Sequence, residues 1–169
     1  MLKITGLILV FLAGTSAGLM GFLSLHRRVT SFEQMERLVS FIETQIRYSG
    51  APVYEILQKA SKSDFGKLKF LQKAADLIRG GLKPDIAWES AINLYCDDVG
   101  FTADDRGLVF DFGKGLGSSD TEGQLRHCET YRRLFSDRLK RARTDAQYKG
   151  RLYITLGICG GLGAALLML

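Results

Sequence analysis

Apolar residues follow two kinds of pattern along this chain. At each end they form a run without a charged residue, over 4–25 and over 152–169. Between these runs they recur every three or four positions, which is the spacing of one face of an α-helix. No stretch alternates apolar and polar residues at every second position, as a half-exposed strand would. The pattern predicts an all-α fold, with a helical bundle between an N-terminal and a C-terminal apolar helix.

Both terminal runs have the length of a membrane-spanning helix. The 22 residues of the first and the 18 of the second would extend about 33 Å and 27 Å as helices, against a hydrocarbon core of about 30 Å. We therefore predict transmembrane helices over 4–25 and 152–169 and a soluble α-helical domain over 26–151. The alternatives are a cleaved signal peptide for the first run and a buried core helix for the second.

Small residues recur four positions apart in each run. Gly14 and Gly18 fall on one helix face, and so do Gly157 and Gly161. Such spacing lets two helix backbones approach closely in lipid. We expect these four glycines to pack the two terminal helices against each other.

Positive charge beside the runs predicts their orientation. Lys3 alone precedes the first run, whereas Lys and Arg are frequent in the middle segment close to both runs. Because these residues resist translocation, we predict a cytoplasmic middle domain. Arg27, Arg28, Lys149 and Arg151 flank the runs directly and are expected to contact anionic lipid headgroups.

The composition narrows the classes of function. With 169 residues, of which 24% are charged and 46% hydrophobic, the chain is one domain and neither disordered nor fibrous. A net charge of +5 beside apolar ends favours a membrane partner over a nucleic acid, and plain solvation of the basic tract 126–151 is the alternative. The three cysteines contain no CxxC pair, which disfavours a disulfide scaffold or a structural zinc site.

The middle segment is predicted to contain about six helices. The first covers 29–48, and residues 49–52 (Ser-Gly-Ala-Pro) end it and start the second, since Gly permits a left-handed cap and Pro suits a first turn. A third is expected over about 65–78, and Pro84 opens a fourth.

Two capping patterns place the remaining helices. Thr102 followed by Asp105 predicts the start of a fifth helix, and Ser119 followed by Glu122 predicts the start of the last and longest. The last helix has an apolar seam, formed by Leu125, Cys128, Tyr131, Phe135, Leu139, Ala142 and Ala146.

No group of residues has the pattern of a catalytic or metal site. The glycine-rich segment 113–119 lacks the Gly-Lys-Ser/Thr ending of a phosphate-binding loop and follows a helix, so we predict no nucleotide site. His127 and Cys128 point about 100° apart on a helix and cannot face each other; we expect a core Cys128 and a solvated His127. The acidic pairs 97–98 and 104–105 lack the order of a calcium loop. We predict no enzyme activity, cofactor or metal.

Two motifs resemble the stage III sporulation protein AB family. One is Leu116-Gly117-Ser118-Ser119-Asp120 followed by Gln124, and the other is the Gly-Ala-Pro turn of residues 50–52. The order of an N-terminal span, a helical middle and a C-terminal span is also similar to that family. The short tail rich in glycine and alanine departs from the longer Ile/Leu-rich tail of the family.

The resemblance implies a part in endospore formation. Proteins of this family belong to the channel complex between mother cell and forespore and resemble the cytoplasmic domains of type II secretion and type IV pilus platform proteins. It implies a non-enzymatic scaffold in the mother-cell membrane that meets other channel-complex membrane proteins and a cytoplasmic assembly ATPase, and it leaves a homo-oligomer open. The residues expected to contact a partner are Gly115, Leu116, Gly117, Ser118, Asp120 and Gln124.

Other interpretations stay open at this point. The residues of the glycine turn could serve only to shape a helix hairpin. A function of another class is a two-span membrane sensor, whose helical bundle lies outside the cell and binds a small ligand. That alternative requires the opposite topology.

Overall fold

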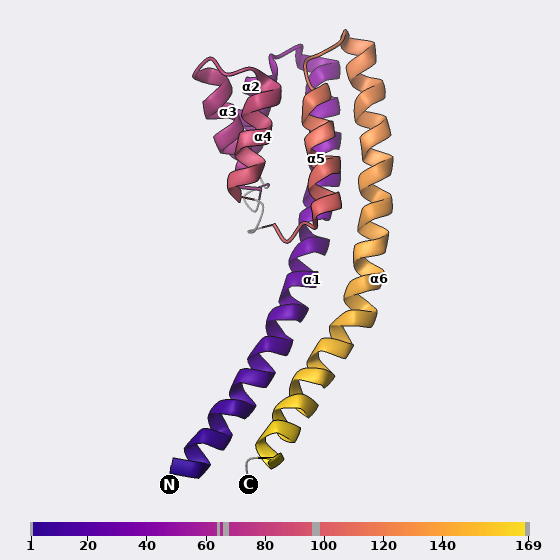
Figure 1. Cartoon of the computed structure of the whole chain (residues 1–169). Coiled ribbons are helices and arrows are strands. Elements are labelled where there is room, and N and C mark those ends of the chain that lie inside the picture. The colour runs from indigo at the N-terminus through magenta and orange to yellow at the C-terminus, as the bar shows by residue number, and fades with distance from the viewer. Residues whose placement is uncertain (1, 64, 66–67, 96–98, 168–169) are drawn as a thin grey trace. The chain divides into compact units, whose positions relative to one another are not determined.

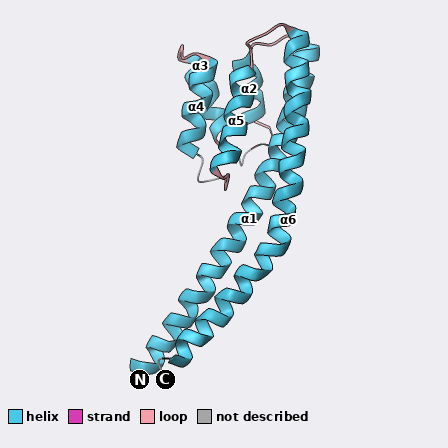
Figure 2. Ribbon diagram, turned by 45° about the vertical axis from the view of Figure 1, so that its right-hand side comes forward, coloured by secondary structure: helices cyan, strands magenta, loops and turns pink. Residues whose placement is uncertain are grey.

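The structure is a computed structural model that describes the backbone of residues 2–63, 65, 68–95 and 99–167. Within these residues it contains six α-helices and no strand (Figures 1 and 2), so the all-α prediction is confirmed. The helices are α1 (Leu2–Ser49), α2 (Val53–Ser61), α3 (Phe70–Arg79), α4 (Pro84–Tyr95), α5 (Ala103–Gly115) and α6 (Thr121–Leu167).

The helices form two compact units. The terminal unit comprises residues 1–29 and 140–169, and the central unit comprises residues 30–139. The outer residues of the predicted 26–151 domain therefore belong to the terminal unit. The helix predicted over 29–48 is not a separate element, because α1 continues through this region from Leu2. Residues 25–29 contain neither Gly nor Pro, the residues that most often end a helix.

In the described part of the chain, no helix combines the length and the hydropathy that crossing a membrane requires. The prediction of two transmembrane helices is thus not confirmed. The side chains of residues 1–5, 7, 8, 10 and 165–169 lie outside the described residues, and these belong to the two predicted spans or border them. In the described remainder, glycine and hydroxyl residues, as at 14–16, dilute the leucines and lower the mean hydropathy.

The core of the central unit is aromatic. Trp88 packs edge-on against Phe70 and Phe112, with ring centroids 5.3 Å and 6.0 Å apart. Its indole N–H donates a hydrogen bond of 2.8 Å to the carbonyl of Val109, so the polar group of this fully buried ring has its partner. Phe112 in turn contacts Phe135 on α6. One cluster of rings therefore joins α3, α4, α5 and α6.

Local turn chemistry sets most helix ends. Gly50 has φ +57° after α1, and α2 begins directly after Pro52, as predicted. α3 ends at Arg79 with Gly80 as its C-cap, and Gly81 has φ +95°. The start of α3 was misplaced: the helix begins at Phe70, because the apolar side chains of Phe65 and Leu68 are buried without helical backbone.

The capping box that starts α5 is confirmed. The Asp105 N–H donates to Thr102 Oγ1 at 3.3 Å, and the Thr102 N–H donates to the Asp105 carboxylate at 3.0 Å. Asp105 is fully buried, and its carboxylate also lies 3.6 Å from the guanidinium of Arg138. The other predicted acidic pair, 97–98, lies outside the described residues, as does Cys96.

The start of α6 differs from the prediction by one residue. Asp120, not Ser119, caps the helix, because its carboxylate accepts a 3.0 Å hydrogen bond from the Gly123 N–H. The apolar seam of α6 is largely buried, with Cys128, Phe135, Leu139 and Ala142 inside the fold. Leu125, Tyr131 and Ala146 are half-buried.

The two helices of the terminal unit pack through glycine. A Cβ built on Gly14 would lie 2.9 Å from the Cα of Gly161, and one on Gly18 would lie 2.6 Å from the carbonyl oxygen of Tyr153 and 3.1 Å from the Cα of Gly157. The 2.9 Å and 2.6 Å distances are shorter than a Cβ tolerates against backbone, and 3.1 Å is tight. The structure thus brings together the four glycines whose spacing indicated a helix pair.

Candidate functional site

The turn between α5 and α6 carries the longer of the two motifs. Leu116 is the C-cap that follows α5 and is buried, with 4% of its surface exposed. Gly117 follows with φ +78°, a conformation that residues with a Cβ rarely adopt. Its N–H donates a 3.0 Å hydrogen bond to the side-chain oxygen of Gln124. The turn therefore reverses the chain around one glycine and one glutamine.

Gln124 holds this turn from the first residues of α6. Its side chain is 6% exposed, and its amide nitrogen donates to the carbonyl of Gly115 at 2.9 Å and to the hydroxyl of Ser119 at 3.2 Å. The Ser118 hydroxyl donates to the same Gly115 carbonyl at 2.9 Å. A buried amide side chain such as that of Gln124 needs such partners. The motif thus forms one hydrogen-bonded unit, which explains the Gln at this spacing.

His127 lies beside the same turn and is half-buried, so the prediction of a solvated His127 was wrong. Its ring stacks on Phe112 with centroids 5.6 Å apart and planes 6° apart, and its Nε2 lies 2.8 Å from the Phe112 carbonyl oxygen. A Cβ on Gly115 would lie 2.1 Å from this ring. Gly115 therefore leaves the space that the imidazole fills.

Sequence reasoning missed this contact because the glycine and the ring lie on different helices. The available signal was the pair Gly113 and Gly115 near the end of an otherwise regular helix. Each of them faces a ring, since a Cβ on Gly113 would lie 2.0 Å from Trp88. Glycine costs helix stability, so two of them so close together indicate a space requirement.

A pocket of about 230 Å³ lies where the α5–α6 turn meets the α1–α2 turn. Figure 1 shows the two turns at the same end of the central unit. Its apolar lining comes from Ile42, Ile46, Val53, Ile56 and Leu116. Its polar lining comes from Ser119, Thr121 and Gln124, beside the backbone of Gly50, Ala51, Pro52 and Gly117. Both motifs that resemble the sporulation family therefore line this tip pocket.

The chemistry of the tip pocket suits an apolar group. Among the described residues, its lining carries no charged side chain. Sites for drug-sized ligands have volumes of about 300–1,000 Å³, so about 230 Å³ is the size of one or two apolar side chains. The turns that frame the pocket are fixed by hydrogen bonds, which lowers the cost of ordering it on binding.

The described residues supply neither a reactive thiol nor a metal-binding cluster near the tip. Burial raises the pKa of the Cys128 thiol to about 11, so this sulfur stays protonated and is a poor nucleophile. Among the described residues no three His, Cys, Asp or Glu side chains converge as they would around a metal ion.

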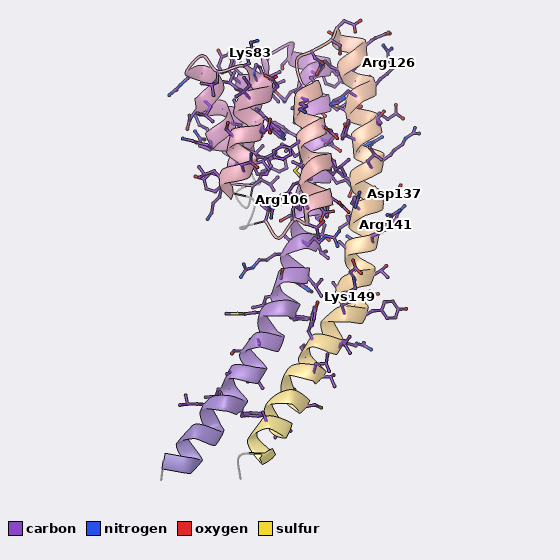
Figure 3. The ribbon with its side chains drawn as sticks, in the orientation of Figure 1. Lys83, Arg106, Arg126, Asp137, Arg141 and Lys149 are labelled. Carbon is purple, nitrogen blue, oxygen red and sulfur yellow. The ribbon has the colours of Figure 1, made fainter. Side chains whose placement is uncertain are left out.

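The four cations predicted to contact lipid fall into two groups within the terminal unit. Arg28 and Lys149 are bound to the Asp145 carboxylate, at 3.1 Å and 2.7 Å (Lys149 is labelled in Figure 3). The hydrogen bond from Lys149, followed by the charge of Lys149 and by Arg28, lowers the pKa of Asp145. Arg27 and Arg151 are exposed. Of the four predicted cations, Arg27 and Arg151 are therefore the two that do not bind Asp145.

The chain is similar to a known protein family and to a solved structure. The family described as stage III sporulation protein AB matches residues 3–169. A solved structure of a stage III sporulation protein AB is similar, with a TM-score of 0.59 and 20% sequence identity. The similarity covers 74% of this chain and 97% of that one, and at this identity it shows the fold alone. No curated protein matches by sequence.

Proposed function

Because this chain belongs to the stage III sporulation protein AB family, we propose that it is a non-enzymatic scaffold of the channel complex between mother cell and forespore. In this proposal the terminal unit anchors the chain in the mother-cell membrane, and the central unit lies in the cytoplasm. Other membrane proteins of the complex and a cytoplasmic assembly ATPase are the proposed partners.

The tip pocket is the observation that carries the scaffold proposal. It is lined by both motif turns and is open at the end of the central unit, and its described lining is mainly apolar and contains no charged side chain. We propose that it receives one or two apolar side chains of a partner protein. Apolar side chains seated in a preformed pocket are typical anchors of protein interfaces.

Membrane anchoring is supported by the surface of the terminal unit. The two charge-free runs carry exposed large apolar side chains along both helices. They include Leu9, Leu12, Leu19, Met20, Leu152, Leu156 and Leu162. Extended apolar surface of this kind marks a contact with protein or lipid.

Val53→Asp tests the tip pocket while sparing the fold. Val53 is half-buried in the pocket and is the first residue of α2, where an acidic side chain is favourable to the helix dipole. The variant should fold normally but place a charge in the apolar pocket. We expect loss of co-purified partner proteins from sporulating cells, with an unchanged protein level and with impaired sporulation.

A matched control is Ile86→Asp. Ile86 also lies in the first turn of a helix, α4, and is exposed outside the pocket. We expect this variant to retain its partners. Equal recovery of partners with Val53→Asp and with the wild-type chain would contradict docking at the pocket. Equal loss with both variants would assign the effect to added charge.

The sensor alternative is less favoured by the size of the pocket. A volume of about 230 Å³ is below the range of sites for drug-sized ligands. Topology separates the two functions directly. Protease added to sealed, right-side-out vesicles should leave residues 30–139 intact if the central unit is cytoplasmic, and digestion of this segment would favour the sensor.

A further inference from the structure

The exposed face of α6 changes its chemistry at one place. Gln147, Tyr148 and Arg151 line a surface recess of about 430 Å³ there. The Tyr148 side chain is 76% exposed, so its ring and hydroxyl are available for an external contact. Directly after Arg151 the charge-free run begins with the exposed Leu152. A basic and aromatic surface therefore borders an apolar one on the same helix.

The change occurs at the same level on both helices of the terminal unit. Arg28 reaches Asp145 at 3.1 Å, and a Cβ on Gly150 would lie 3.0 Å from the ring of Phe22. These contacts align residues 22–28 of α1 with residues 145–150 of α6. The ends of the two charge-free runs fall within about one turn of this stretch. At a bilayer surface, both helices must change from charged to apolar residues at the same level. A helix pair in water has no such requirement.

The ion pairs of this region indicate which cation is best placed to bind an anionic group. Asp145 binds Arg28 and Lys149, and it offsets part of their charge. Arg151 is exposed within the recess, beside an amide and a phenol that can both donate hydrogen bonds. A guanidinium presents a planar fork of N–H donors that matches phosphate oxygens.

We propose that Gln147, Tyr148 and Arg151 form a binding site for the phosphate of an anionic lipid headgroup. This inference rests on the proposed membrane anchoring and names the lipid chemistry at its boundary. Tyrosine is enriched at the headgroup level of membranes, where its ring meets lipid and its hydroxyl meets water. The neighbouring exposed residues Leu152 and Leu156 favour a membrane over a nucleic acid, because a nucleic acid offers them no apolar surface.

The test uses the full-length chain and vesicles of two compositions. The chain, diluted from detergent, is mixed with phosphatidylcholine vesicles or with vesicles that also contain phosphatidylglycerol, and bound protein is recovered by flotation. The wild-type chain should prefer the anionic vesicles. Arg151→Gln should lower this preference about fivefold, as expected for one arginine near an anionic surface. Tyr148→Ala should weaken binding to both vesicles, and Tyr148→Trp should restore it.

Arg132→Gln is the matched control. Arg132 is an exposed arginine of α6 within the central unit, so the variant changes net charge equally without touching the recess. We expect it to keep the preference for anionic vesicles. Equal losses with Arg132→Gln and Arg151→Gln, or no loss with Arg151→Gln, would overturn the headgroup site and indicate diffuse attraction.

Two further arms identify the source of the phosphate. The preference should persist in inorganic phosphate at matched ionic strength, and its disappearance would indicate a free-anion site instead of a lipid site. An oligonucleotide should not displace the chain from anionic vesicles, and displacement would overturn the lipid assignment. A wild-type chain that binds neither vesicle would overturn the proposed anchoring as well. A chain that binds both vesicles equally would overturn the headgroup site alone.

Discussion

Glycine serves different purposes in the two units. In the central unit, Gly113 and Gly115 make room for aromatic rings, since a Cβ on either would lie about 2 Å from Trp88 or His127. In the terminal unit, Gly14 and Gly18 make room for the backbone of the other helix. At these four positions, glycine in the central unit admits an aromatic side chain, and glycine in the terminal unit brings two helix backbones close together.

This difference determines how precisely the contacts of each unit define its structure. The rings of the central unit are fixed by directional contacts, such as the indole of Trp88 on the Val109 carbonyl and His127 stacked on Phe112. Such contacts define a single arrangement of the tip. Close packing of two helix backbones is not directional. The packing of the terminal unit therefore depends on small residues where the two helices cross and on the ion pairs around Asp145. The two units should therefore respond to different substitutions.

The largest effect is expected from Trp88→Ala. This variant removes the largest buried side chain of the central unit together with its hydrogen bond to Val109. We expect the free energy of unfolding to fall by about 3–5 kcal/mol, as for other buried aromatic residues. Urea unfolding of the full-length chain, followed by far-UV circular dichroism because Trp88 is the sole tryptophan, measures this loss. Leu94→Ala, at an exposed residue of the same helix, should change stability little.

Alanine at two glycines of α5 should give effects of opposite sign. Gly113→Ala would push a methyl group into the ring of Trp88, and we expect a loss of about 1–3 kcal/mol. Gly107 lies in the same helix, and a Cβ added there would meet nothing within 4 Å, so Gly107→Ala should stabilise the chain by about 0.5–1 kcal/mol through helix propensity. The same urea titration compares them. Losses of equal size would show that Gly113 is not a space requirement.

A corresponding pair of glycine substitutions tests the terminal unit. Gly18→Ala would place a Cβ against the Tyr153 carbonyl and push the helices apart, at a cost of about 1–3 kcal/mol. A Cβ on Gly160 would meet nothing within 4 Å, so Gly160→Ala should leave the pair unchanged. Spin labels at the exposed positions 12 and 162 report the separation in the full-length chain. An unchanged label distance with Gly18→Ala would contradict the packing of the two helices through glycine.

The sequence predicts features that depend on neighbouring residues. Apolar spacing indicated the helices, the Gly-Ala-Pro turn at 50–52 indicated a chain reversal, and Thr102 with Asp105 indicated a cap. The start of α3 was misplaced because apolar spacing looks alike in a helix and at buried non-helical residues such as Phe65 and Leu68. Local pattern cannot distinguish these two, since only tertiary contacts decide which backbone buries those side chains.

Contacts between residues that are far apart in the sequence could not be predicted from the sequence. Arg28 and Asp145 are separated by 117 positions, and nothing near Arg28 signals that a carboxylate will meet it. The same holds for His127, whose stacking depends on the space at Gly115. The motif at 116–124 predicted a turn between two helices, whereas the tip pocket became visible only when the second turn was placed beside it.

The smallest effect on stability is expected from Asp145, which tests the ion pairs of the terminal unit. Lys149 and Arg28 lower its pKa in the folded state. The resulting stabilisation is present above the unfolded pKa of about 3.9 and is lost as the pH falls through the lower folded pKa. It is worth at most about 1 kcal/mol, because the pair is partly exposed. Asp145→Asn should remove this acid-dependent part, as measured by the 12–162 label distance at neutral and acidic pH.

Asp145→Asn should also act on lipid binding with the opposite sign to Arg151→Gln. Without the carboxylate, Arg28 and Lys149 keep their full positive charge beside the proposed headgroup site. The preference for phosphatidylglycerol vesicles should therefore rise about fivefold for the one negative charge removed. Asp111→Asn, at an exposed residue of α5, makes the same change of charge in the central unit and should have no effect. A rise with both variants would show that net charge, and not the position of Asp145 beside the membrane boundary, controls the interaction.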